Sequence, residues 1–186
     1  MKKGIIIGLL FTCIFASSAR VMTYNLLNYD DDNSRETYFI TIINFVNPNI
    51  IVAEEVQSQT GYSHFKSDVL DVANPNEWSG ATFTNQSASQ DIALYYQHDL
   101  FTFISTSTIN TAQSSGTRDV VEWVMMHNDS EIEFRIYGVH LKASSGDENA
   151  QQRLAETTIL RDYLNTLPAG SEFIVAGDFN IYSHSP

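Results

Sequence analysis

The sequence of 186 residues is poor in cysteine, proline and glycine, and each shortage excludes a class of protein. A single cysteine excludes a disulfide scaffold, and four prolines with nine glycines exclude collagen-like and low-complexity chains. Hydrophobic residues make up 43% of the chain, which is too much for a disordered protein. We therefore expect one folded domain with a packed core.

Basic residues are also scarce: 10 lysines and arginines stand against 22 aspartates and glutamates, giving a formal net charge of −12. Proteins that hold nucleic acid on a broad basic face neutralise its phosphates with lysine and arginine. The composition argues against that class of binder. If the protein handles phosphate, we expect metal ions to take part.

The one long hydrophobic run covers residues 5–15, after two lysines and before the small residues 17–19. This pattern is typical of a secretory signal peptide, and the run is shorter than the roughly 20 residues that span a bilayer. We expect residues 1–19 to be a signal peptide that takes Cys13 with it. The mature chain is expected to be secreted or periplasmic, with no stable membrane association.

Hydrophobic periodicity predicts the order of helices and strands. The predicted strands span residues 20–27, 49–56, 81–84, 91–96, 100–106, 118–126, 132–140 and 173–176. The predicted helices span residues 34–46, 62–72 and a segment from Asp147 to Pro168. The apolar face of the first helix comprises Tyr38, Phe39, Ile42, Ile43, Phe45 and Val46. Such an order predicts mixed α/β layers with helices covering the sheets.

Polar residues that could take part in binding or catalysis lie at the ends of these predicted strands, where functional sites are commonly built. They are Asn25, Glu55, His140, Asp178 and Asn180. A carboxylate at the end of a core strand can bind a hard cation such as Mg²⁺, and Glu54 is an equal candidate for that role. Taken singly, each residue also fits a structural role.

A carboxylate near His140 would raise its pKa, so that a protonated imidazole could face a phosphate. Asp178 and Asn180 stand two residues apart, and their side chains would project to the same side of an extended backbone. The carboxylate could then accept a proton or orient water, and the amide could donate a hydrogen bond to an oxyanion.

Four separated segments carry a family resemblance: residues 22–29 (MTYNLLNY), 50–56 (IIVAEEV), 137–142 (YGVHLK) and 175–180 (VAGDFN). In this order they resemble the endonuclease/exonuclease/phosphatase superfamily, which has the deoxyribonuclease I-like fold, and in particular its secreted bacterial branch. The resemblance implies a four-layered α/β sandwich, in which two mixed β-sheets are flanked by helices.

Carried over by position, the resemblance implies a metal site at Glu55 and Asn25, with Glu55 as the direct ligand. It implies that His140 contacts the scissile phosphate. It also implies that Asp178 and Asn180 orient the attacking water and stabilise the transition state.

Two further positions follow from the resemblance. Arg118 resembles a family arginine that contacts the substrate phosphate. Glu54 stands where many relatives have glutamine, a departure that leaves the ligand position intact.

The C-terminal end departs from the family pattern, because the sequence ends six residues after Asn180. Relatives carry a further segment with an aspartate and a histidine that complete the active site. His184 is not expected to replace that histidine, since so short a tail cannot form the strand that presents it. We expect residues 20–186 to be the N-terminal part of a truncated domain, inactive or severely impaired as it stands.

The implied activity is metal-assisted, in-line hydrolysis of a phosphodiester, with Mg²⁺ as cofactor and Mn²⁺ or Ca²⁺ as alternatives. The favoured interpretation is an endonuclease-like enzyme with nucleic acid as a candidate substrate. One alternative is a phosphatase or phosphodiesterase for lipid head groups or small phosphate esters. The other is a noncatalytic secreted binding module with the same fold.

Overall fold

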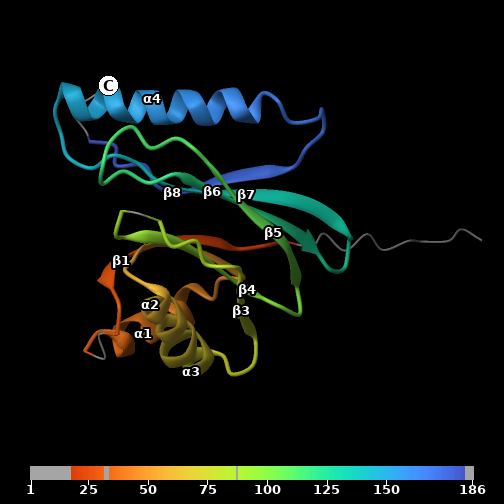
Figure 1. The fold of residues 1–186 in the computed structure, drawn as a ribbon. Coiled ribbons are helices and arrows are strands. Elements are labelled where there is room, and N and C mark those ends of the chain that lie inside the picture. Colours follow the sequence, from red (N-terminus) through yellow and green to blue (C-terminus); the bar gives the residue numbers. More distant parts are fainter. Residues whose placement is uncertain (1–17, 32–33, 87, 183–186) are drawn as a thin grey trace, which may run out of the picture.

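A computed structural model of the chain describes residues 18–31, 34–86 and 88–182. The expected signal peptide lies almost wholly outside this part, and so does His184. Two four-stranded sheets pack face to face, with helices on the outer side of each (Figure 1). Within the described residues, no helix is both long and apolar enough to cross a membrane.

The first sheet is mixed, with the strand order β1-β2-β4-β3. Strand β2 pairs in parallel with β1 and antiparallel with β4, and β3 pairs antiparallel with β4. The four strands are β1 (Val21–Tyr29), β2 (Ile50–Val56), β3 (Trp78–Gly80) and β4 (Asp91–Gln97). The parallel pairing places the C-terminal ends of β1 and β2 side by side.

The second sheet has the order β5-β6-β7-β8. Its first three strands form an antiparallel meander, and β8 returns in parallel with β7 after the long helix α4. These elements are β5 (Phe101–Ile109), β6 (Val120–His127), β7 (Ile132–His140), α4 (Asp147–Leu164) and β8 (Phe173–Asp178). The parallel pair sets His140 opposite Asp178.

Helices form the two outer layers (Figure 1). Helix α4 covers the second sheet, where Leu160 and Leu164 pack against strand residues such as Tyr137 and Val139. The first sheet is covered by α1 (Glu36–Val46), α2 (Gln59–His64), the π-helical segment η1 (Phe65–Leu70) and α3 (Asp71–Ala73). The expected four-layered α/β sandwich is confirmed.

The space between the sheets holds an apolar core shared by both. Its fully buried members include Ile50, Val52, Ile92 and Leu94 from the first sheet and Val121, Trp123, Met125 and Ile136 from the second. Burial of side chains of this size stabilises the fold by about 1.5–3 kcal/mol each. This core holds the strand ends of the two sheets in a fixed relation.

One expected strand is wrong, because residues 81–84 lie outside any sheet. The Ala81 amide still donates to the Leu94 carbonyl of β4 at 2.9 Å, but the Ala81 carbonyl accepts a hydrogen bond from the Tyr62 hydroxyl, at 2.7 Å, and the pairing ends there. The sheet edge is formed instead by β3, just before this run. The helix expected at 62–72 is part of a longer helical segment that covers residues 59–73.

The expected apolar face of α1 is divided between core and solvent. Phe39 and Ile43 are buried, whereas Tyr38 and Phe45 are 70% and 89% exposed. Asn33 and Glu36 have the sequence spacing of a capping box at the start of this helix, but Asn33 lies outside the described residues.

Strand β8 forms one edge of the second sheet, and β7 is its only partner among the described strands. Phe173 and Ile174 at its start are each 39% exposed. A hollow of about 450 Å³ lies beside them, lined also by Ile132 and Phe134.

Candidate active site

The polar residues expected at strand ends converge at one end of the two sheets. Asn25 in β1 pairs with Glu54 in β2, and His140 in β7 pairs with Asp178 in β8. A hydrogen bond of 3.2 Å from Asn25 Nδ2 to Asp178 Oδ2 joins the first sheet to the second. Residues far apart in the sequence therefore share one site.

The Asn25 amide bridges two carboxylates. Its Nδ2 donates to Glu55 Oε1 at 2.9 Å as well as to Asp178, and its Oδ1 accepts from the Leu27 amide at 2.9 Å. Since the amide oxygen has a donor partner and the nitrogen has two acceptor partners, the orientation of the amide follows from its contacts. The oxygens of Glu55 and Asp178 therefore face a common point.

The Glu55 carboxylate is held on its other side as well. Its Oε2 accepts hydrogen bonds from the Asn28 amide at 3.0 Å and from Gln90 Nε2 at 3.3 Å. The Glu55 backbone has a φ of 63°, in the left-handed region that non-glycine residues rarely adopt. The same region holds other residues of the site: Leu27, Asn28, Gln90 and Asn180. Such conformations persist where surrounding contacts enforce them, and they gather at functional sites.

Glu54 differs from its neighbour in environment. It is 1% exposed, and its Oε1 has no hydrogen-bond partner among the described residues. Burial raises the pKa of Glu54 to about 8, with further contributions from the charges of Asp178 and Glu55. The sequence left the two glutamates as equal candidates, and the structure makes Glu55 the one that the surrounding amides orient.

His140 is 5% exposed, and its Nδ1 has no hydrogen-bond partner in the described part of the chain. Burial lowers the pKa of His140, and the charge of Arg118 lowers it further. The opposing effects of Asp178, Glu55 and a hydrogen bond to the Gln90 main chain are smaller. The expectation of a raised pKa and a protonated imidazole is therefore wrong for this environment, which favours the neutral ring.

Asp178 and Asn180 are also arranged differently from the expectation. Strand β8 ends at Asp178, and Asn180 has a φ of 49°, so the backbone is not extended. Asp178 Oδ1 accepts from the Asn180 amide at 2.9 Å. Asn180 Nδ2 donates to the Leu141 carbonyl at 2.9 Å, which ties the turn after β8 to the end of β7.

Arg118 lies just before β6 and is buried. Its Nε and Nη2 donate to the Ser89 carbonyl at 3.1 and 2.9 Å, and Nη2 also donates to Gln90 Oε1. Burial lowers the pKa of Arg118, while the nearby charge of Glu55 is the largest effect that raises it. The arginine is thus anchored to the loop before β4, at the site.

The donor set fits a hard divalent cation. Within the described residues, no group of three or more histidine, cysteine, aspartate or glutamate side chains has the arrangement of a closed metal site. Mg²⁺ does not require one, since it commonly binds one or two carboxylates together with water and substrate oxygens. Asn25 Nδ2 lies between the Glu55 and Asp178 oxygens, at 2.9 and 3.2 Å; because this nitrogen is a donor, Asn25 would bind a cation only through Oδ1, beside the two carboxylates.

Sequence reasoning missed Gln90 and Asp91. Gln90 belongs to an irregular loop with no motif, so only its contacts identify it. Asp91 is buried at the start of β4, where burial raises its pKa to about 6 and Arg118 opposes the rise. Its position directly before the apolar run of β4 is the one signal that the sequence offers.

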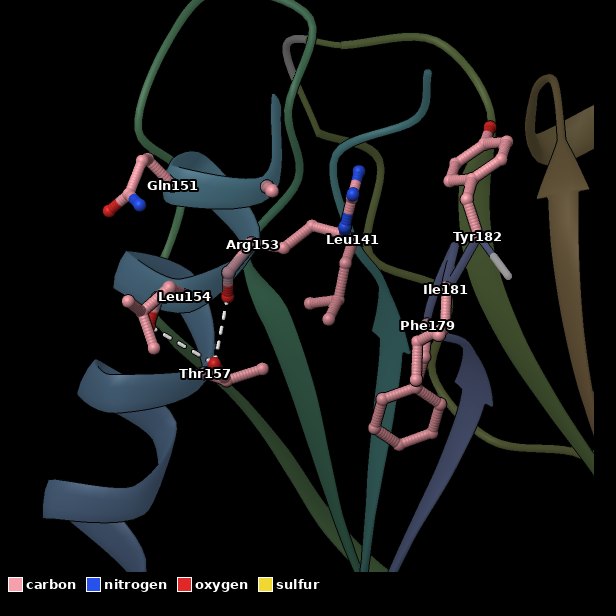
Figure 2. A pocket seen from close by; sticks show the side chains of 9 residues that line it. Leu141, Gln151, Arg153, Leu154, Thr157, Phe179, Ile181 and Tyr182 are labelled. Carbon is pink, nitrogen blue, oxygen red and sulfur yellow. Dashed lines mark hydrogen bonds between the residues drawn. The ribbon is translucent and has the colours of Figure 1, made fainter. Parts of the chain in front are cut away.

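An apolar pocket of about 400 Å³ lies between α4 and the end of β8 (Figure 2). Leu154 from the helix faces Phe179 and Ile181 from the other wall. Arg153 donates to the carbonyls of Lys142 and Ser144 near its rim, each at 2.9 Å. None of the expected site residues lines this pocket.

No protein-family model and no curated protein matches the chain. Solved structures do. The human Nocturnin catalytic domain with bound sulfate anion has a TM-score of 0.67 at 20% identity, covering 90% of this chain and 65% of that one. TDP2 from D. rerio, complexed with a single-strand DNA product, has a TM-score of 0.68 at 12% identity, covering 89% and 62%.

An endonuclease/exonuclease/phosphatase family protein from Bacteroides thetaiotaomicron has a TM-score of 0.65 at 15% identity, covering 90% of this chain and 66% of that chain. The chain thus spans 62–66% of the length of these three structures. The likeness agrees with the resemblance of the four sequence segments. The chain has the deoxyribonuclease I-like fold of the endonuclease/exonuclease/phosphatase superfamily.

Proposed function

We propose that the chain is the N-terminal part of a secreted, metal-dependent phosphoesterase that hydrolyses phosphodiester bonds, in the manner of an endonuclease. The observation that carries the proposal is the hydrogen-bonded group of Asn25, Glu55 and Asp178 beside His140, at the joined strand ends of the two sheets. A group of carboxylates, an amide and an imidazole at one point is suited to phosphate chemistry.

Glu55 and Asn25 would hold a divalent cation, Mg²⁺ or its alternatives Mn²⁺ and Ca²⁺, which neutralises phosphate charge and polarises a phosphoryl oxygen when bound. Asp178 accepts a hydrogen bond from the attacking water and so orients it. His140, neutral in this environment, donates one hydrogen bond to a phosphate oxygen. The turn at Asn180 fixes Asp178 through its amide.

The molecules bound in two of the compared structures support this function, although they were bound by other proteins. The TDP2 structure contains a single-strand DNA product, and the Nocturnin structure contains a sulfate anion, which is tetrahedral like phosphate. The acidic composition instead favours a smaller substrate, such as a lipid head group or a small phosphate ester. That substrate class is the second candidate.

A substrate panel tests the function. The 186-residue chain, and a form extended by the coding sequence that follows Pro186, are assayed on DNA, RNA, sphingomyelin and inositol phosphates with Mg²⁺, Mn²⁺ or Ca²⁺. We expect hydrolysis by the extended form, its loss on chelation with EDTA, and a severe loss in Glu55→Ala and His140→Ala. Glu131→Ala and His98→Ala are matched controls in which exposed residues outside the site are changed.

Near-normal turnover in Glu55→Ala or His140→Ala would remove that residue from the site. Activity of the short chain that is abolished by His184→Ala would overturn the interpretation of the C-terminal tail. If the extended protein binds neither Mg²⁺ nor Mn²⁺ and hydrolyses nothing, it is a noncatalytic binding module.

Secretion is tested separately. Expression with the native N-terminus in a bacterial host, followed by N-terminal sequencing of protein from the periplasm or medium, should give Arg20 as the first residue. Retention of the uncleaved chain in the cytoplasm would contradict the signal peptide.

A further inference from the structure

Gln90 occupies a central place in the candidate site that its sequence context does not reveal. It is the last residue of the loop between β3 and β4, and its side chain is half-buried. Its φ of 72° lies in the left-handed region, which disfavours residues with a side chain. This backbone conformation persists because contacts on both sides of the residue fix it.

Both ends of the Gln90 amide contact charged residues of the site. Oε1 accepts a hydrogen bond from Arg118 Nη2, and Nε2 donates to Glu55 Oε2 at 3.3 Å. Nε2 also donates to Asn28 Oδ1, which accepts from Gln57 Nε2 at 2.8 Å as well. A guanidinium can only donate and a carboxylate only accepts, so the amide fits in one orientation.

The Gln90 amide thereby connects the two sheets. Glu55 is the last residue but one of β2, a central strand of the first sheet, whereas Arg118 lies two residues before β6 of the second. Arg118 is itself fixed, since it is buried and donates twice to the Ser89 carbonyl.

We propose that Gln90 is a positioning residue, which holds the Glu55 carboxylate in place for a divalent cation by linking it to Arg118. The inference rests on the proposed function, because it concerns the same metal site. Arg118 then acts on Glu55 through the amide, without a direct hydrogen bond to the carboxylate. Groups that orient a metal ligand in this way commonly contribute about 10–100-fold to metal affinity.

The test is Mn²⁺ binding to the full chain, measured by titration calorimetry and by the electron paramagnetic resonance signal of free Mn²⁺. Gln90→Met keeps the length of the side chain and removes its three hydrogen bonds, to Arg118, Glu55 and Asn28. We expect its Mn²⁺ dissociation constant to rise about 10–100-fold. Gln90→Asn keeps an amide that is one methylene too short, and the same direction is expected.

Gln86→Met is the matched control. Gln86 lies in the same loop and also bridges to the segment before β6, with Nε2 donating to the Asp119 carbonyl at 3.0 Å and Oε1 accepting from the Asp119 amide at 2.7 Å. Its side chain has no hydrogen bond to the expected site residues, and its main-chain amide donates to Asp91 Oδ1 at 3.1 Å, a contact that the substitution keeps. Its variant should bind Mn²⁺ as the unchanged chain does, and thermal unfolding identifies which variants fold.

The outcomes separate the two proposals. Mn²⁺ binding that is lost in Glu55→Ala but unchanged in both Gln90 variants overturns the role of Gln90 and leaves the proposed function intact. Equal losses of Mn²⁺ affinity in the Gln90 and Gln86 variants would assign the effect to the loop as a whole. That result would also overturn the positioning role of Gln90. A chain that binds no Mn²⁺ at all contradicts the metal centre and the inference together.

Discussion

Three buried carboxyl groups surround the candidate active site: Glu54, Asp91 and Glu156. Each has one oxygen without a hydrogen-bond partner among the described residues, and burial raises the pKa of each. A carboxylate that loses water without gaining a partner favours its protonated form. The folded protein therefore keeps protons on these groups at a pH where the unfolded chain has released them.

For Asp91, the direction in which pH changes the free energy of unfolding can be predicted and measured. Burial raises its pKa to about 6 in the folded protein, against an ordinary value of 3.8. Between these values the folded state binds a proton that the unfolded state lacks, so the free energy of unfolding falls as pH rises. The fall is expected to be roughly 2–3 kcal/mol and to end above about pH 6.

Asp91→Asn should remove this part of the pH dependence, because the amide does not titrate. Urea unfolding of both proteins between about pH 4 and pH 7 measures it, since the other acids contribute equally and cancel in the difference. A difference that stays constant across this range would show that Asp91 is ionised throughout.

At the residue scale, the polar residues that the sequence singled out at strand ends lie together in the structure. Asn25, Glu55, His140 and Asp178 each follow or end an apolar run, and sheet pairing then brings them together. Gln90 could not be found in this way, since its contacts depend on how a loop folds between two sheets. The pKa of His140 likewise depends on its burial and on Arg118, which is distant in sequence.

At the scale of elements, the spacing of β7 and β8 depends on Gly177. Its φ is 138°, and a Cβ atom at this position would lie 2.0 Å from the Val139 carbonyl oxygen. The backbones of the two parallel strands therefore approach too closely for a side chain. This approach sets the distance between His140 and Asp178, which are the next residue pair along the strands.

Gly177→Ala is expected to lower the free energy of unfolding by about 3 kcal/mol or more, because the clash involves main-chain atoms that cannot rotate away. Gly170→Ala is the control, with a φ of 86° but no atom within 4 Å of the added Cβ. It should lose only about 1 kcal/mol, from backbone strain alone. Guanidinium unfolding compares the two, and equal losses would refute the steric explanation.

Helix α1 offers a second comparison within one element. Phe39 is buried and makes edge contacts with the rings of Tyr24, Tyr29 and Phe65, with centroids 5.6 to 5.7 Å apart. Phe39→Ala should destabilise the protein by about 3–5 kcal/mol, whereas Phe45→Ala should change stability by less than about 0.5 kcal/mol. Chemical unfolding of both variants measures this difference, and a large effect of Phe45→Ala would show that its exposed side is covered in solution.

Periodicity predicted the elements better than it predicted their contacts. It located α1, but it assigned Phe45 to the same apolar face as Phe39. Helical spacing does not show how much of the helix surface packs against the sheet. The strand expected at 81–84 is absent, and the Ala81 carbonyl there accepts a hydrogen bond from the Tyr62 hydroxyl of α2, a contact that periodicity does not show. The order of elements predicted mixed α/β layers, the family resemblance implied four of them, and both expectations are confirmed.

At the scale of the whole molecule, charge sets the approach of a substrate. The protein has a net charge of −12, and a phosphodiester is also an anion. For an active form, kcat/KM toward a charged substrate should therefore rise as KCl increases from about 20 to 150 mM, since salt screens the repulsion. A fall in kcat/KM, as basic nucleic-acid binders show, would reveal a local positive surface that dominates the net charge.

The exposed edge of β8 affects whether the molecule associates with itself in solution. Its outer main-chain groups are unpaired in the described structure, and Phe173 and Ile174 stand partly exposed beside the adjacent hollow. An edge of this kind is a template for strands of other molecules. Concentration-dependent self-association is expected, and Ile174→Lys should shift sedimentation toward the monomer.

Sedimentation velocity over a range of concentrations measures this shift, and a monomer at all concentrations would contradict it. The consequence is practical as well as structural. Association through β8 would add strands to the sheet that carries His140 and Asp178, so the concentration of protein becomes a variable of every binding and activity measurement on this chain.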